Sequence, residues 1–424
     1  MSAVVERANP RAIPGPLLGL CGVLMLIGLV SFFVGLGRDP QTAWLAFHVN
    51  YLYFGAMAQG GMALACALAI VGAKWAGPVR HVAASLAAWV PVTFVLCLIG
   101  GLFGGEYIFA NWWHGAPYPK QHWLTPGRVY TTDLIILGVL SLLSYRFIKA
   151  SFRPACHGAA EQASGWAKQR FESWSRDWKG DVAEQATAKQ KLAVLAPVTA
   201  LAFAFGYGMI GFDQVMSLTP SWFSNIFAWY FAWGGFLCGI TLTALICVLL
   251  RNTPGWREEI DRPRMHDLGK MVWAFSIFWM YLFFSQYIVI WYGNLPEETQ
   301  FFSMRLGSQF LQDTWFWEWS RLDEPYVKLS LAAWAGCWII PFTILIGQAA
   351  KKTPAILGSI SAISLLGFWL ERNALVWPSL IPDDGMAWAG VIQFGIALGF
   401  LGAFALVHLA FSRVFPTLPL PVRD

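Results

Sequence analysis

The stretch SQYIVIWYGNLPEET, residues 285–299, closes an apolar run that begins near residue 270. The run is long enough to cross a bilayer, which takes about 20 apolar residues, and only a helix or a closed barrel satisfies its own backbone there. Asn294, Pro296 and two glutamates then end it, as expected where a helix leaves the membrane. Ser285, Gln286 and Tyr287 lie about two turns before this exit, and polar groups at such a depth indicate a function.

The rest of the chain repeats this pattern. Its 424 residues are 57% hydrophobic and only 12% charged, whereas soluble domains are about 25% charged. The sequence therefore predicts an all-α polytopic membrane protein with ten transmembrane helices. The predicted spans are 17–37, 44–72, 82–104, 129–149, 191–213, 225–250, 270–293, 326–348, 354–376 and 388–411.

The distribution of positive charge predicts the orientation. Most of the 29 Lys and Arg residues lie in the segments on one side of the predicted spans, above all in 146–191 and 251–270. Because cytoplasmic loops are rich in Lys and Arg, both termini are expected in the cytoplasm. The first span is too long for a signal-peptide core, so we expect no cleaved leader. The net charge of +5 reflects this asymmetry, and we expect no nucleic-acid partner.

Cysteine and histidine usage argues against a redox centre. The seven cysteines are scattered, without the C-x-x-C or C-x-x-C-H spacing of iron–sulfur and c-type haem sites. His48 and His408 are predicted near opposite membrane faces, so they could not serve as paired axial ligands of haem b. We therefore expect no haem, iron–sulfur cluster or metal in this chain.

Two loops stand out. The inner loop 150–190 carries Trp166, Phe171, Trp174 and Trp178, whose spacing predicts one face of a helix lying in the interface. The outer loop 294–325 is rich in aromatic and acidic residues. Either a belt of aromatic residues at the membrane exit or a docking surface for an extramembrane partner explains that composition.

A weak internal repeat divides the chain. GGEYIFANWW (104–113) aligns with FSQYIVIWYGN (284–294), which matches Glu106 with Gln286 and Tyr107 with Tyr287. We infer two four-helix bundles, spans 2–5 and 6–9, flanked by peripheral spans 1 and 10. The predicted divisions are 1–43, 44–213, 214–376 and 377–424. Since glutamine cannot titrate, acid–base chemistry is expected in the first bundle.

Ionisable residues gather at the predicted outer end of that bundle. Glu106 follows the glycine-rich GGLFGG, which allows a close approach to the backbone. Alternatively, Asp133 suits a first helical turn, Asp213 ends a helix, His48 packs in a core, and His114 and His122 are ordinary loop residues. Glu371 and Arg372 lie within span 9, and as neighbours on a helix they point about 100° apart and need not pair.

Two longer segments carry a resemblance to a known family. FDQVMSLTPSWFSNIFAWYFAWGGFLCG (212–239) and FSQYIVIWYGNLPEET (284–299) resemble the polysulfide-reductase, NrfD-like integral membrane family. The similarity is to the second quinone-binding-type subunit of bacterial alternative complex III, a quinol:cytochrome c oxidoreductase. It covers spans 2–9, and it implies two four-helix bundles without a redox centre.

The resemblance also implies a setting and a site. The setting is the bacterial inner membrane, among lipid, beside a homologous first NrfD-like subunit, a periplasmic iron–sulfur protein, multihaem and monohaem cytochromes c, small membrane subunits and a terminal oxidase. The expected role is quinol binding, proton translocation or both. The candidate catalytic residues are Glu106, Asp133, Asp213 and His48, and the candidate quinone contacts are His114, Tyr107, Gln286 and Tyr287.

Two other function classes remain. A catalytically silent anchor would only dock the iron–sulfur and cytochrome c subunits. A secondary transporter would carry inverted repeats and helices broken at the bilayer midplane. The repeat here is parallel and the polar groups gather at one face, which disfavours the transporter.

Overall fold

The computed structural model describes residues 12–253, 256–311 and 322–415. Within these residues every regular element is helical. Ten helical segments are long and apolar enough to cross a membrane, which confirms the predicted all-α, multi-pass fold. They are Gly15–Arg38, Pro40–Ile70, Gly77–Ile108, Pro126–Ala160, Asp181–Leu218, Phe227–Leu250, Arg262–Gly293, Val327–Leu345, Pro354–Ser379 and Val391–Val414.

Most spans are one long helix, and two contain a π turn. The continuous helices are α2 (Gly15–Arg38), α3 (Pro40–Ile70), α7 (Pro126–Ala160), α9 (Asp181–Gln214), α10 (Phe227–Leu250), α12 (Arg262–Gly293), α17 (Pro354–Val376) and α18 (Val391–Val414). The third span comprises α4 (Gly77–Ser85), α5 (Val90–Ile99), a π turn at Gly100–Gly104 and α6 (Gly105–Ile108). The eighth comprises α14 (Val327–Trp334), a π turn at Ala335–Ile339 and α15 (Ile340–Leu345).

Local sequence signals set several helix ends. Asp39, Thr125 and Asp261 accept the backbone N–H three residues later and cap α3, α7 and α12, and each is followed within two residues by a proline suited to the first turn. Asn294 ends α12 in the left-handed conformation, a role that asparagine tolerates. The exit noted in the sequence is therefore a helix cap followed at once by α13 (Pro296–Leu306).

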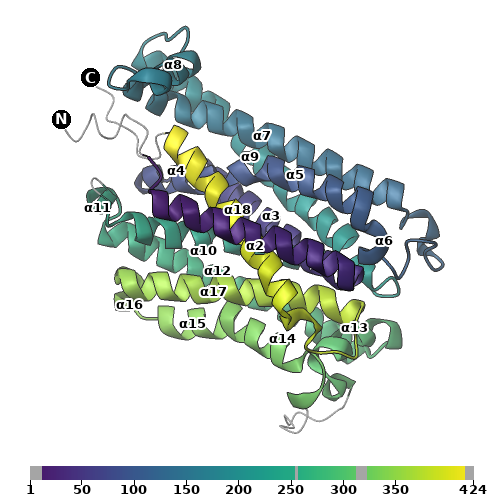
Figure 1. Ribbon diagram of the computed structural model, residues 1–424. Coiled ribbons are helices and arrows are strands. Elements are labelled where there is room, and N and C mark those ends of the chain that lie inside the picture. The colour runs from purple at the N-terminus through teal and green to yellow at the C-terminus, as the bar shows by residue number, and fades with distance from the viewer. Residues whose placement is uncertain (1–11, 254–255, 312–321, 416–424) are drawn as a thin grey trace.

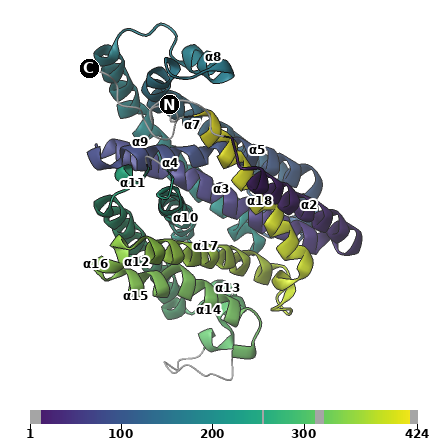
Figure 2. The same ribbon diagram turned by 60° about the vertical axis from the view of Figure 1, so that its left-hand side comes forward.

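The spans form two groups of four, in the predicted order. Helices α3, α4–α5, α7 and α9 pack together, and α10, α12, α14–α15 and α17 form the second group. Figure 1 and Figure 2 show the first group above the second, with α2 and α18 crossing along one side. The chain leaves the same end of these groups after Ile108, Leu218, Gly293 and Ser379, and this end is called here the predicted outer end.

Glycines allow the two bundles to meet. A Cβ on Gly60 of α3 would lie 1.9 Å from the carbonyl oxygen of Gly235 on α10, and one on Gly239 would lie 2.2 Å from the carbonyl carbon of Gly60. The backbones of α3 and α10 are thus in direct contact. Since this contact is between backbones, rotation of a side chain cannot relieve an added methyl group.

The first and last spans lie at the edge, as predicted, and they also pack against each other. Helix α18 packs along α2, and both also contact α3. A Cβ on Gly28 would lie 2.3 Å from the Cα of Gly399, so the pair is again joined through glycine. Only 11% of the span window of α2 is buried, which leaves most of this helix for lipid.

The aromatic residues of loop 150–190 do not share one face of a helix, contrary to the prediction. Helix α8 covers only Gly165–Trp174, so Trp178 lies beyond it. Phe171 is buried and Trp166 is 48% exposed. Trp178 stacks on His157 at 3.7 Å between ring centroids. The prediction from the spacing was wrong because part of this polar stretch continues the helices of the neighbouring spans. Helix α7 extends to Ala160, and α9 begins at Asp181.

The predicted outer loop 294–325 is only partly described, because residues 312–321 lie outside the described residues. Its first half is α13 followed by a short 3₁₀ turn at Ser308–Leu311. Phe301, Phe302 and Phe310 are buried, so these aromatic residues pack inward on the bundle. They form neither an exposed belt nor an exposed docking surface.

Candidate functional site

Two of the predicted site residues, Asp133 and His48, belong to a buried polar network in the first bundle. Asp133 of α7 is fully buried, and its Oδ2 accepts a 2.6 Å hydrogen bond from the side-chain amide of Gln214. His48 of α3 donates from Nε2 to the backbone carbonyl of Gln214 at 2.8 Å. Gln214 ends α9, so it joins three helices at the predicted outer end.

Asp213, next to Gln214 in the chain, makes a separate ion pair. Its fully buried carboxylate pairs with Arg128, which lies in the first turn of α7 and also covers the ring of Trp123. Asp213 Oδ1 and Asp133 Oδ1 are buried and have no hydrogen-bond partner among the described residues. Asp133 on α7 and Asp213 on α9 are thus each left with one unsatisfied carboxylate oxygen.

Glu106, His114 and Tyr107 lie at the protein surface. Glu106 pairs with His114 at 3.2 Å, and their side chains are 63% and 77% exposed. Tyr107 is 37% exposed. In the chain by itself, Glu106 therefore faces solvent or headgroups rather than a desolvated pocket.

The close approach predicted for GGLFGG is present, and aromatic rings of the chain itself make it. A Cβ on Gly101 would lie 2.7 Å from the ring of Tyr130, and one on Gly104 would lie 2.4 Å from Trp44. A Cβ on Gly105 would lie 2.2 Å from Trp113. Gly101 and Gly104 belong to the π turn and Gly105 begins α6. All three admit bulky neighbours from the chain itself, so they give no evidence of a ligand.

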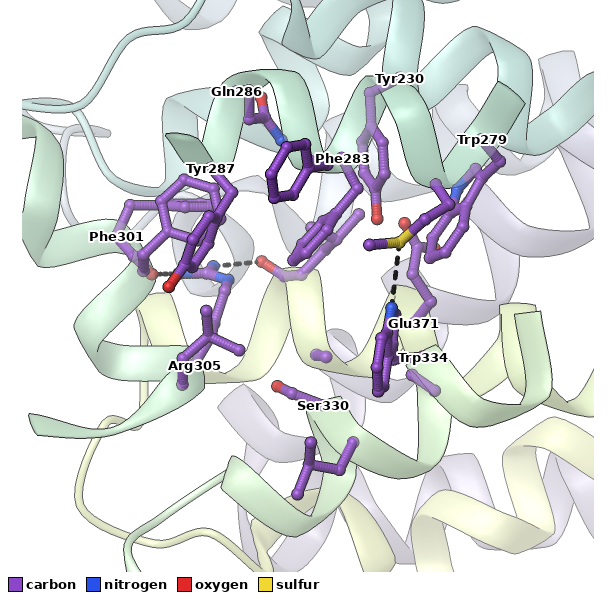
Figure 3. Close-up of a pocket in the computed structure, with 18 residues that line it drawn as sticks. Tyr230, Trp279, Phe283, Gln286, Tyr287, Phe301, Arg305, Ser330, Trp334 and Glu371 are labelled. Atoms are coloured by element: carbon purple, nitrogen blue, oxygen red, sulfur yellow. Dashed lines mark hydrogen bonds between the residues drawn. The ribbon is translucent and has the colours of Figure 1, made fainter. Parts of the chain in front are cut away.

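Gln286 and Tyr287 line a cavity in the second bundle. The cavity has a volume of about 460 Å³, within the range of about 300–1,000 Å³ that is usual for small-molecule sites. Its walls are mainly apolar, with eight aromatic residues among the eighteen that line it, and come from α10, α12, α13, α14 and α17. Figure 3 shows Arg305 at one side of this space and Glu371 at the other. The labelled residues are Tyr230, Trp279, Phe283, Gln286, Tyr287, Phe301, Arg305, Ser330, Trp334 and Glu371.

Several polar atoms at this cavity are unsatisfied. Trp279 Nε1, Arg305 Nε, Ser330 Oγ and Glu371 Oε1 are buried and have no hydrogen-bond partner among the described residues, and all four residues line the cavity. Buried polar groups are nearly always hydrogen-bonded, so such atoms require an explanation. Gln286, in contrast, accepts a 3.1 Å hydrogen bond from Ser224.

Arg305 closes the predicted outer side of the cavity. It lies on α13, outside the spans, and its side chain donates to the carbonyls of Phe301 and Leu375 and to Ser379 Oγ, each at 2.7 Å. Burial lowers the pKa of the Arg305 guanidinium to about 9, so the group remains charged at neutral pH. Among the described residues no carboxylate forms an ion pair with it.

Glu371 and Arg372 pair with each other, although neighbours on a helix need not do so. The Arg372 guanidinium donates to Glu371 Oε2 and lies over the ring of Phe231 at 4.3 Å. The Tyr230 hydroxyl lies beside the Glu371 carboxylate (Figure 3). Long side chains let the two charged ends meet despite their divergent Cα–Cβ directions.

Arg128, Gln214, Arg305 and Glu371 were not predicted as site residues. In the sequence analysis the two arginines entered only the comparison of positive charge between inner and outer segments. Nothing in the sequence shows that α13 folds back over the bundle. Glu371 carried the clearest signal, because it is an ionisable residue inside a span.

Among the described residues, no group of three or more His, Cys, Asp or Glu side chains is arranged to hold a metal ion. The chain thus offers two buried polar regions, one network and one cavity, at the predicted outer ends of its two bundles. A scan against models of known protein families gave no match, and a search of curated proteins gave none either.

Proposed function

We propose that this multi-pass membrane protein is a subunit of a quinol:cytochrome c oxidoreductase of the alternative complex III type. In that role it contributes to quinol binding, proton transfer or both, and redox centres lie in partner subunits. The proposal rests on the two sequence segments that resemble NrfD-like subunits. The expected setting is the bacterial inner membrane, with both termini cytoplasmic.

The network around Asp133 is the structural observation that supports it. A carboxyl group can take up and release a proton, and this one lies within a span, fully buried, with one oxygen unsatisfied. Ionisable groups at such positions are costly and typically functional. The network lies at the predicted outer end of the first bundle, where the ionisable residues were expected from the sequence to gather.

The complex itself provides the first test. A tag on this chain is expected to recover, from bacterial membranes, an iron–sulfur protein and c-type cytochromes together with quinol:cytochrome c reductase activity. Recovery of the chain without cytochromes and without this activity would contradict the proposed function.

Variants at the two carboxylates Asp133 and Glu106 distinguish a role in proton transfer from an effect of surface charge. Asp133→Asn is expected to lower quinol:cytochrome c turnover of the assembled complex about tenfold, since an amide cannot carry the proton. Glu106→Gln keeps the side-chain shape at a surface position, and we expect turnover within about twofold of wild type. The measurement is turnover with membrane-potential formation in reconstituted complex. Equal turnover in both variants would argue against a role for the buried network.

A catalytically silent anchor is the second candidate, and the pairing of Asp213 with Arg128 favours it. This pair links the end of α9 to the first turn of α7. It gives the buried Asp213 a structural role that requires no proton transfer. The anchor predicts that Asp133→Asn assembles normally and turns over at the wild-type rate.

A further inference from the structure

The cavity of the second bundle has hydrogen-bonding groups of opposite character at its two sides. Arg305 Nε–H is an unused donor on one side. On the other, the Glu371 carboxylate accepts from Arg372 at Oε2 and lies beside the Tyr230 hydroxyl, which leaves Oε1 as its remaining acceptor. Figure 3 shows the ring of Tyr287 near Arg305, the ring of Trp334 near Glu371 and Phe283 in the space between. A ligand that satisfies both sides needs an acceptor at one end, a donor at the other and a flat apolar body.

A water molecule or a lipid acyl chain fits this arrangement poorly. An acyl chain would fill the aromatic space and leave Arg305 Nε and Glu371 Oε1 desolvated and unpaired, which is unfavourable. The cavity holds far more than one water, and its walls are predominantly apolar. A para-dihydroxy aromatic ring has oxygens at opposite ends and two faces for stacking, so it meets all three requirements.

The cavity also borders the membrane. Phe284 of α12 lines it and is 50% exposed, and Leu331 of α14 lines it and is partly exposed. Both residues belong to predicted spans, so the surface they share faces lipid. A hydrophobic tail attached to the ring could leave between these two helices without crossing polar surface.

We propose that the second-bundle cavity binds the ring of a membrane quinol. One hydroxyl donates to Glu371 Oε1, the opposite oxygen accepts from Arg305 Nε, and the tail leaves past Phe284 and Leu331. This inference rests on the proposed function for the identity of the ligand. It places the ring in the second bundle, whereas the repeat in the sequence favoured acid–base chemistry in the first.

The test uses a photoreactive azido-decylquinol with the complete complex in native membranes. After illumination, the label is expected in peptides that contain 279–287 or 301–306, and excess decylquinol should compete for it. Hexadecanol, which has an apolar chain but no ring, should compete poorly. Labelling is read by mass spectrometry, independently of turnover.

Two adjacent alanines on α14 provide a matched pair of variants. Ala333 is 3% exposed and lines the cavity, whereas Ala332 is exposed and does not line it. Ala333→Phe should fill the space and reduce labelling at least about tenfold, because little room for the ring would remain. Ala332→Phe adds the same side chain toward lipid and should leave labelling unchanged.

Glu371→Gln tests the polar end. The amide still offers an oxygen to Arg372 but loses the stronger charge-assisted bond, so quinol competition should weaken about tenfold. Asp133→Asn, the same change at the first-bundle acid, should not alter this labelling. If Glu371→Gln does not assemble, the alanine pair decides the result.

Three results would overturn the inference. They are labelling confined to α7 and α9, equal labelling in Ala333→Phe and Ala332→Phe, and equal competition by hexadecanol and decylquinol. The first of these leaves the proposed function standing. Conversely, competed labelling of the cavity in a complex without quinol:cytochrome c activity would uphold the site and contradict the proposed function.

Discussion

Gly60→Ala is expected to destabilise the protein by about 3 kcal/mol or more and to remove most of the folded chain from the membrane. The new methyl group would lie 1.9 Å from the carbonyl oxygen of Gly235 and 2.6 Å from its carbonyl carbon. Both atoms are backbone, so α3 and α10 would have to separate. Because these two helices join the bundles, the whole interface would change with them.

A matched change on the lipid-facing side isolates this steric effect. Gly22→Ala on α2 adds the same methyl group where nothing lies within 4 Å. Alanine favours a helix over glycine by about 1 kcal/mol, so this variant should be neutral or slightly stabilised. The measurement is the folded fraction after heating, followed by fluorescence-detected gel filtration of the detergent-solubilised complex. If Gly60→Ala unfolded at the same temperature as the wild type, the result would contradict the close packing of α3 and α10.

The arrangement of the spans could be predicted because hydrophobic length and a weak internal repeat can both be read along the chain. The second and sixth spans each hold a glycine pair, Gly60-Gly61 and Gly234-Gly235, and Gly60 and Gly235 meet in space. Helix ends, such as Asn294 followed by Pro296, could also be predicted, because a helix cap depends only on residues close to it in the sequence. These features depend on neighbours within a few residues or on composition over a span.

The site was harder to predict because its partners are distant in sequence. Asp133 and Asp213 were singled out as ionisable residues near spans, but Gln214 and Arg128 are polar residues at helix ends, where such types are common. The cavity depends on α13 folding over the bundle to place Arg305 beside Leu375 and Ser379. The hydrophobic periodicity of the sequence does not indicate this packing. The alignment of Gln286 with Glu106 also led us to expect the chemistry in the first bundle.

The Glu371–Arg372 pair shows how a buried charge constrains the second bundle. Both residues lie at the contact of α17 with α10, where Arg372 is 1% exposed and approaches the backbone of Phe231 and Gly234. Removing one partner of such a pair leaves a charge that is neither solvated nor compensated. Replacing both together removes that penalty, so the two changes should be strongly non-additive.

Arg372→Leu is therefore expected to lower the free energy of unfolding by about 3–5 kcal/mol, since it leaves the buried Glu371 carboxylate without its cation, beside Tyr230 and Trp279. The double variant Glu371→Gln with Arg372→Leu replaces the ion pair by a neutral amide and an apolar side chain, and it should recover at least half of that loss. The measurement is again the folded fraction of the solubilised complex after heating, compared across wild type, both single variants and the double variant. A double variant no more stable than Arg372→Leu alone would show that the guanidinium contributes by packing on Phe231 rather than by neutralising Glu371, because lost packing cannot be restored by removing the acid.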